Sequence, residues 1–292
     1  MSAEKDPGKP LAPGLYLVAT PIGNLEDITL RALRVLRSAD RIACEDTRQT
    51  QKLLNHFEIR TPTVSYHMHN EGTRTEELIA ELKQGARIAV VSDAGTPGIA
   101  DPGGQIAAAA IAAGIAVFPI PGANAAISAL IASGLPTDQF IFHGFLPAKA
   151  GQRKTALEEL TQGEGTHIFY EAPHRILDTL ADVQAVFGAS QHVVLARELT
   201  KLHEEFLRGP AGQLHSELAA RASVRGEIVL ILAPSPTKNS AEKTRSLAVE
   251  ITALMKSEGI SEKDALKRVA RERGIGKSEA YRELQREQNR RR

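Results

Sequence analysis

The feature that most constrains the fold is the alternation of short β-branched runs with helical patterns between Gly14 and Ser133. The clearest run is Arg87–Ser92, R-I-A-V-V-S, which is continuously apolar and lacks polar alternation. Such a strand is typical of the centre of a parallel sheet, because helices cover both of its faces. The repeated strand–helix–strand rhythm therefore predicts an α/β fold built on a parallel sheet.

The segment Ser133–Thr137 has the Gly/Pro chemistry of a loop, so we predict two α/β domains, at 14–135 and 136–233. In the first domain we expect strands at 14–19, 41–44, 63–66, 87–92 and 115–119 and helices at 28–38, 47–56, 73–84, 103–113 and 123–133. In the second we expect strands at 140–143, 167–170, 192–195, 205–207 and 227–232 and helices at 151–160 and 173–186. The close spacing of the last three strands predicts antiparallel pairing.

The two ends of the chain have different compositions. Residues 1–13 are polar and rich in Pro and Gly, which predicts a disordered lead-in, and residues 234–241 have the composition of a linker. Residues 242–292 lack any strand signal, and helices are expected at 242–258, 262–273 and 279–288. Gly259 and Gly274 end the first two helices, and Ser261 and Ser278 cap the next ones, which predicts a small helix-turn-helix unit.

The charge of the chain is unevenly distributed. Residues 238–292 carry 15 Lys and Arg against 9 Asp and Glu, a net charge of +6, whereas the preceding residues carry 21 against 26, a net of −5. A basic appendage on an acidic body is typical of a surface that faces a polyanion, although a solvated helical tail has the same composition. The single cysteine, Cys44, permits no intramolecular disulfide, and together with the lack of an apolar run of membrane-spanning length this predicts a cytoplasmic protein without membrane contact.

Three Gly/Pro-rich loops follow predicted strands, at Thr20–Asn24, Ser92–Gly104 and Pro119–Ala125. In an open α/β sheet, ligands bind beyond the carboxyl ends of the strands, so these loops are expected to form one wall of a binding crevice. The thirteen residues of Ser92–Gly104 exceed the roughly 2–6 residues of an ordinary loop between strand and helix. Asp93 and Asp101 in this loop are suited to bind ligand hydroxyls or an ammonium group. No metal site is predicted, because His67 and His69 lack a third ligand at suitable spacing.

Long motifs in these loops resemble a known family. The segments TPIGNLEDIT, EDTR, SDAGTPGIADPG, PIPGANAAISAL, FYEAPHR and ARELTKLHEEFLRG together resemble the rRNA 2′-O-ribose methyltransferase branch of the tetrapyrrole methylase superfamily, over about Gly14 to Leu232. The resemblance implies two α/β domains with S-adenosyl-L-methionine bound in the cleft between them, usually in a homodimer. It also implies methyl transfer to the ribose 2′-hydroxyl of a cytidine, number 1402, in 16S small-subunit rRNA.

The resemblance assigns roles to individual residues. The residues that would bind the cofactor are Pro21, Ser92, Asp93, Ala94, Gly95, Thr96, Ile99, Ala100, Ala123, Ala125, Tyr170 and Gly226. Glu171 and Glu198, each placed directly after a strand, are candidates for the base that takes the 2′-hydroxyl proton. Both are equally interpretable as a helix cap or an ion-pair partner of Arg175 or Arg197.

Basic residues in two regions are candidates for binding RNA. Arg175, Arg197 and Lys201 are suited to position phosphates, although structural ion pairs would explain them as well. In the helical unit the candidates are Lys267, Arg268, Arg271, Lys277 and Arg282. The expected partner is rRNA or an assembled small ribosomal subunit.

Two other functions remain open at this point. The superfamily includes enzymes that methylate corrin or porphyrin macrocycles and a branch that methylates a modified histidine of a protein, so the fold does not fix the acceptor. A non-enzymatic nucleic-acid-binding adaptor, built around the helical unit, is the other alternative. Binding of S-adenosylmethionine separates the adaptor from both enzymes, and affinity for RNA rather than a macrocycle separates the two methyltransferases.

Overall fold

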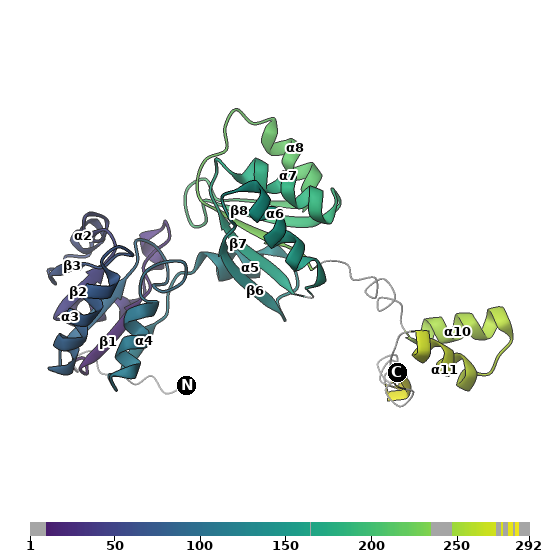
Figure 1. Ribbon diagram of the computed structural model, residues 1–292, viewed down its shortest axis with the longest axis horizontal. Coiled ribbons are helices and arrows are strands. Elements are labelled where there is room, and N and C mark those ends of the chain that lie inside the picture. Colours follow the sequence, from purple (N-terminus) through teal and green to yellow (C-terminus); the bar gives the residue numbers. More distant parts are fainter. Residues whose placement is uncertain are drawn as a thin grey trace. The chain divides into compact units, whose positions relative to one another are not determined.

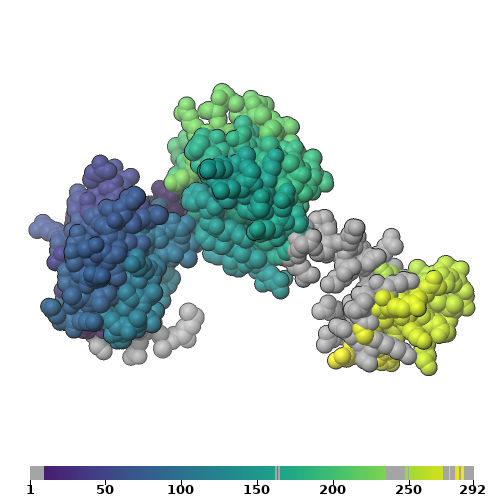
Figure 2. All heavy atoms as spheres, in the orientation of Figure 1, coloured from purple at the N-terminus to yellow at the C-terminus, as the bar shows by residue number. Residues whose placement is uncertain are grey.

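The computed structural model describes residues 10–163, 165–234, 247–272, 276, 280–282 and 284–285, the coloured part of the chain in Figure 2. The chain divides into two compact units. The first contains two β-sheets with their helices and ends at Ala233, and the second contains the C-terminal helices. The predicted lead-in up to residue 9 and the predicted linker beyond Pro234 lie outside the described residues.

The N-terminal sheet is five-stranded, entirely parallel and ordered β3-β2-β4-β1-β5. Figure 1 labels β1, β2 and β3 of this sheet. Its strands are β1 (Gly14–Val18), β2 (Arg41–Cys44), β3 (Thr63–Ser65), β4 (Arg87–Val91) and β5 (Val117–Ile120). The parallel sheet predicted from the strand–helix rhythm is confirmed. β4, which the sequence marks as continuously apolar, pairs with both β1 and β2 and therefore lies at the centre.

Helices cover both faces of this sheet, as its apolar strands require. Alternate residues of β1, β2 and β4 pack on α1 (Leu30–Ser38) and α2 (Thr47–His56) on one face. The other residues of these strands pack against α3 (Glu71–Lys83) and α4 (Gly104–Ala112). The short helix η1 (Leu25–Asp27) precedes α1, and the Thr29 hydroxyl caps α1 by accepting a hydrogen bond from the Ala32 amide at 3.0 Å.

The C-terminal sheet has the order β6-β7-β10-β8-β9. Its strands are β6 (Phe140–Phe145), β7 (Thr166–Glu171), β8 (His192–Arg197), β9 (Glu205–Pro210) and β10 (Ile228–Leu232). The β6–β7 pair is parallel, and β10 runs antiparallel to both β7 and β8, as β8 does to β9. The predicted antiparallel pairing of the last three strands is confirmed.

The C-terminal sheet also has two covered faces. On one lie α6 (Ala150–Glu159), which continues into the short helix η2 (Leu160–Gln162), then α7 (Ile176–Phe187) and α8 (Ala211–Ala219). On the other face lies α5 (Ala125–Ser133), which precedes the predicted boundary at residue 135 but packs against β7, β8 and β10. Helix α8 was not predicted from the sequence, although Leu214 and Leu218 have helical spacing and are both buried.

The second unit is helical. α10 (Leu247–Glu258) and α11 (Glu262–Glu272) pack together through an apolar core that also includes Ala280 and Leu284. The predicted cap is present, because the Ser261 hydroxyl accepts a hydrogen bond from the Asp264 amide at 3.2 Å. Within the described part of the chain, no helix is both long and apolar enough to cross a membrane.

Candidate functional site

The three Gly/Pro loops meet at the carboxyl edge of the N-terminal sheet, where hydrogen bonds connect them. The backbones of Thr20 and Gly95 pair in both directions, at 2.8 and 3.1 Å. The Thr96 hydroxyl donates to the Ala123 carbonyl at 3.1 Å and accepts from the side chain of Asn124 at 3.3 Å. The loops that follow β1, β4 and β5 therefore form one braced wall.

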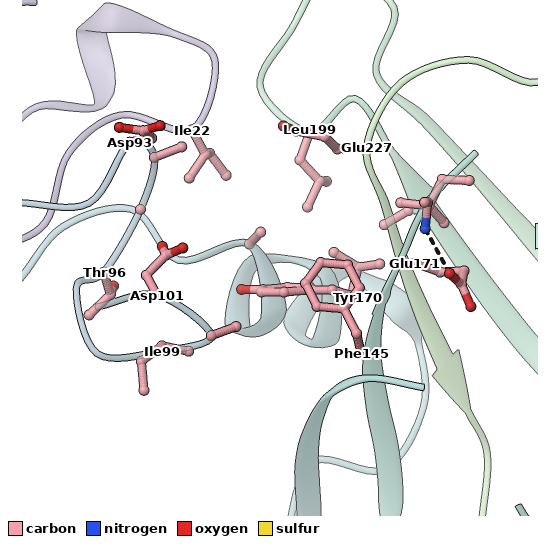
Figure 3. Close-up of a pocket in the computed structure, with 18 of the residues that line it drawn as sticks. Ile22, Asp93, Thr96, Ile99, Asp101, Phe145, Tyr170, Glu171, Leu199 and Glu227 are labelled. Carbon is pink, nitrogen blue, oxygen red and sulfur yellow. Dashed lines mark hydrogen bonds between the residues drawn. The ribbon is translucent and has the colours of Figure 1, made fainter. Parts of the chain in front are cut away.

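This wall faces the C-terminal sheet across a cavity of about 440 Å³, within the size range of small-molecule sites. The loops of the N-terminal sheet and helix α5 contribute Ile22, Glu45, Asp93, Ala94, Gly95, Thr96, Ile99, Ala100, Asp101 and Ala125. The C-terminal sheet and its loops contribute Phe145, Tyr170, Glu171, Ala172, Pro173, Ala196, Leu199, Glu227, Ile228 and Val229. Figure 3 shows the two groups on opposite sides of the cavity.

Most residues predicted to bind a cofactor lie in this cavity. Asp93, Ala94, Gly95, Thr96, Ile99, Ala100, Ala125 and Tyr170 line it, whereas Pro21, Ser92, Ala123 and Gly226 do not. Ser92 is buried behind the wall, and its hydroxyl donates to the Ala94 carbonyl at 3.3 Å. Ala123 contributes the carbonyl that holds Thr96. These two residues shape the wall from behind.

The cavity is acidic. Five carboxyl-bearing residues line it, and none of the described lining residues is Lys, Arg or His. Burial, followed by the nearby charge of Glu45, raises the pKa of Asp101 to about 6. Burial and the neighbouring Asp93 raise the pKa of Glu45 as well. A lining of this kind favours a cationic ligand and disfavours a phosphate.

The remainder of the lining is apolar or aromatic. Ile22, Leu199 and Val229 contribute aliphatic surface, and the rings of Phe145 and Tyr170 lie edge to face with their centroids 5.8 Å apart. Such surfaces are suited to a flat heterocycle. Ile22, Glu45, Phe145 and Leu199 were not predicted from the sequence. Glu45 directly follows β2 and Leu199 lies two residues after β8, so their position after a strand was an available signal.

Glu171, a predicted catalytic base, has its carboxylate fully engaged. Its oxygens accept hydrogen bonds from the Thr179 hydroxyl at 2.7 Å and the Ala172 amide at 2.8 Å, and Arg175 lies 3.3 Å away. The side chain is completely buried. In Figure 3 the carboxylate points away from the cavity. The ion pair with Arg175 corresponds to the alternative interpretation of Glu171, whereas a helix cap does not, because α7 has no side-chain cap.

Glu198, the other predicted base, is held in a strained loop outside the cavity lining. It adopts φ 49°, and its carboxylate accepts from Lys201 at 2.9 Å and from the Glu227 amide at 3.1 Å. The hydrogen bond from Lys201 lowers the pKa of Glu198. Gly226 lies so close that a Cβ atom there would be 2.3 Å from the Glu198 Cγ.

The predicted phosphate-binding cations of the first unit also have protein partners. Arg175 donates to the carbonyls of Leu146 and Pro147 at 2.8 and 3.1 Å, in addition to its ion pair. Arg197 pairs with Glu205, and Lys201 bridges Glu198 and Glu227. The aliphatic stem of Lys201 also packs over Gly23 of the first loop.

In the helical unit, Lys267, Arg268, Arg271 and Arg282 are all exposed, and Arg268 pairs with Glu258. Lys277 lies outside the described residues. Among the described residues, no group of three His, Cys, Asp or Glu side chains is arranged to hold a metal ion.

The fold and the site define a class of protein. The profile of the tetrapyrrole (corrin/porphyrin) methylases matches residues 14–215. Among solved structures, uroporphyrin-III-C-methyltransferase from Thermus thermophilus superposes with a TM-score of 0.54 at 21% identity, over 76% of this chain and 94% of that one. Diphthine synthase superposes with a TM-score of 0.57 at 15% identity, over 75% and 89%. The chain belongs to the tetrapyrrole methylase family.

Sequence comparison narrows this class. A protein of Halalkalibacterium halodurans is 52% identical over 91% of this chain and 93% of its own length, and one of Synechocystis is 48% identical over 91% and 95%. A protein of Bacillus subtilis is 44% identical over 91% and 92%. All three are named ribosomal RNA small subunit methyltransferase I, and this chain belongs to their branch of the family.

Proposed function

We propose that this protein is an S-adenosyl-L-methionine-dependent methyltransferase that acts on the ribose 2′-hydroxyl of cytidine 1402 in 16S rRNA. The observation that carries the proposal is the acidic cavity behind three braced loops, in a chain 44–52% identical to relatives whose name specifies small-subunit rRNA. The sulfonium and ammonium charges of the cofactor match a lining in which Glu45, Asp93 and Asp101 have no described ion pair and which contains no described cation.

The residues of the cavity suit the parts of this cofactor. Asp93 attracts its cationic groups, and the Asp93 carboxylate is held in place by the Asp46 amide at 3.1 Å. Tyr170, Phe145 and Leu199 offer apolar surface for the adenine. When bound, S-adenosylmethionine supplies a methyl group on a good leaving group. The braced loops then contribute mainly by holding the donor in line with the acceptor, an effect worth about 7–11 kcal/mol in well-oriented reactions.

The proposal also covers the loop residues outside the cavity, the acceptor, the oligomeric state and the cellular location. Pro21, Ser92, Ala123 and Gly226, which do not line the cavity, are expected to influence cofactor binding through the loops they support. The acceptor is rRNA or an assembled small subunit, the active form is a homodimer, and the enzyme works in the cytoplasm, where its substrate is made.

The direct test is methyl transfer from radiolabelled S-adenosylmethionine to small ribosomal subunits from cells that lack the gene. We expect label at one nucleotide, mapped by nuclease digestion to the 2′-oxygen of the cytidine. Small subunits from wild-type cells, already methylated, are the control and should accept no label. Cofactor binding without transfer to rRNA would overturn the proposed acceptor and favour a macrocycle or a protein. Absence of both would overturn the methyltransferase.

The basic helical unit is proposed to anchor rRNA through phosphates. Deleting residues 238–292 should weaken RNA binding and reduce the steepness of its salt dependence. Each lost phosphate contact lowers the slope of log K against log salt by about 0.7–0.9. The measurement is a salt titration of RNA binding by the full chain and by the truncated chain. An unchanged slope would show that the unit has another role.

A further inference from the structure

Asp101 lies in the long loop after β4 and lines the cavity. It follows Ala100, whose φ of 61° lies in the left-handed region that side chains seldom adopt. A hydrogen bond between the Gly98 amide and the Pro102 carbonyl, at 3.1 Å, closes the loop around it. Figure 3 shows the Asp101 carboxylate pointing into the cavity, with the Tyr170 hydroxyl directed toward its loop from the opposite side.

The groups around Asp101 are acidic or neutral. Glu45 from the end of β2 and Asp93 from the end of β4 line the same cavity, and Tyr170 approaches from β7. Glu227 lies at the start of β10, on the far side. The nearby Ser92 hydroxyl lowers the pKa of Asp101 in part, against the larger effect of burial. None of the described Lys, Arg or His side chains forms an ion pair with Asp101.

This environment differs from that of the two glutamates predicted to act as bases. A general base must be within reach of the acceptor proton and have a lone pair that is not already committed. Glu171 is engaged by three partners and points out of the cavity, and Glu198 is tied to Lys201 and a backbone amide. Asp101 faces the cavity, and among the described residues neither a cation nor a backbone amide binds its carboxylate.

We infer that Asp101 is the proton acceptor in methyl transfer, an assignment that rests on the proposed function. The ribose 2′-oxygen forms a bond to the methyl carbon as the carbon–sulfur bond breaks, and the bonding pair remains on sulfur, which becomes a neutral thioether. The 2′-hydroxyl proton passes to the Asp101 carboxylate. Its pKa of about 6 keeps the carboxylate mostly ionised at neutral pH while it remains a stronger base than an exposed aspartate.

The test compares Asp101→Asn with the wild type in three measurements. Transfer to unmethylated small subunits should fall about 100-fold, the size of a lost general base. The calorimetric Kd for S-adenosylmethionine should stay within about threefold. The wild-type rate should fall tenfold per pH unit below pH 6. This fall, the acid limb of the pH–rate profile, should be absent from the residual rate of the variant.

A further readout does not depend on activity. Thermal unfolding of the cofactor-free protein should show Asp101→Asn to be more stable than the wild type at pH 8, with the difference vanishing below pH 4. The reason is that the folded protein holds an ionised Asp101 at the cost of its burial. Asp138→Asn, which changes an exposed aspartate outside the cavity, is the control and should leave all of these measurements unchanged.

The outcomes separate the inference from the function on which it rests. An unchanged rate, or a loss of cofactor affinity as large as the loss of rate, would overturn the assignment while leaving the methyltransferase intact. No label transfer by the wild type would overturn the proposed function and the assignment together. If Asp101→Asn does not fold, Asp101→Glu retains the carboxylate and should keep the acid limb; a profile without that limb would contradict the role.

Discussion

The carboxylates of the two sheets differ in their partners. At the cavity edge of the N-terminal sheet, Asp93 and Asp101 have no described ion pair, and the pKa of Asp101 is raised to about 6. In the C-terminal sheet, Glu171, Glu198 and Glu205 each pair with at least one cation. Paired carboxylates stabilise the position of strands and loops, whereas carboxylates without a cation remain available to a ligand. At the cavity, the carboxylates without a described ion pair therefore come from the N-terminal loops, and the paired ones come from the C-terminal sheet.

The largest effect on stability is expected from Glu171→Ala, which removes a completely buried carboxylate. The change leaves Arg175 and the Thr179 hydroxyl without their acceptor, so we expect the free energy of unfolding to fall by about 3 kcal/mol. Chemical denaturation measures this loss. Glu217→Ala is the control, because its more exposed pair with Arg221 should contribute less than about 1 kcal/mol. Equal losses for the two variants would remove the distinction between buried and exposed pairs.

A smaller loss, of about 2 kcal/mol, is expected from Gly226→Ala. The glycine has φ 84°, and a new Cβ would overlap the Glu198 side chain. Gly85→Ala separates these two contributions, because Gly85 has φ 90° but open space around it, and should cost about 1 kcal/mol. Denaturation midpoints of both variants give the difference. If Gly85→Ala is as costly as Gly226→Ala, crowding against Glu198 contributes nothing.

The smallest effect concerns acid stability. The bidentate hydrogen bonds from Arg221, followed by Arg197, lower the pKa of Glu205 to about 2 from an ordinary value of 4.5. The stabilisation is therefore present above pH 4.5 and is lost as the pH falls toward 2. Because the pair is partly exposed, Glu205→Gln should cost only about 1 kcal/mol at pH 7. Unfolding curves of variant and wild type should converge near pH 2; a constant gap would exclude this linkage. Ionisation of Glu205 therefore stabilises the folded protein, whereas ionisation of Asp101 destabilises it.

The sequence predicted the parts of this molecule that depend on local patterns. Apolar runs such as Arg87–Val91 identify the central strand, and Gly/Pro loops after strands identify the cavity wall. Helix α8 was missed because it begins directly after a strand that ends in Pro210, with no loop between the two elements. The Arg175 partner of Glu171 was predicted, because it lies four residues further along the chain. The contact of Glu198 with the Glu227 amide was not predictable in the same way, because these residues meet only after the chain folds back.

The C-terminal sheet has its last strand in sequence at its centre. β10 is fully buried and pairs with β7 and β8, so these two neighbours have no partner between them until residues 228–232 have been synthesised. The N-terminal sheet, by contrast, is complete once β5 ends at Ile120. Such non-local pairing is intrinsically slow to form. During synthesis the first sheet is therefore able to fold well ahead of the second. A chain truncated before Ile228 lacks the central strand of its second sheet, which joins β7 to β8, and not merely an edge strand.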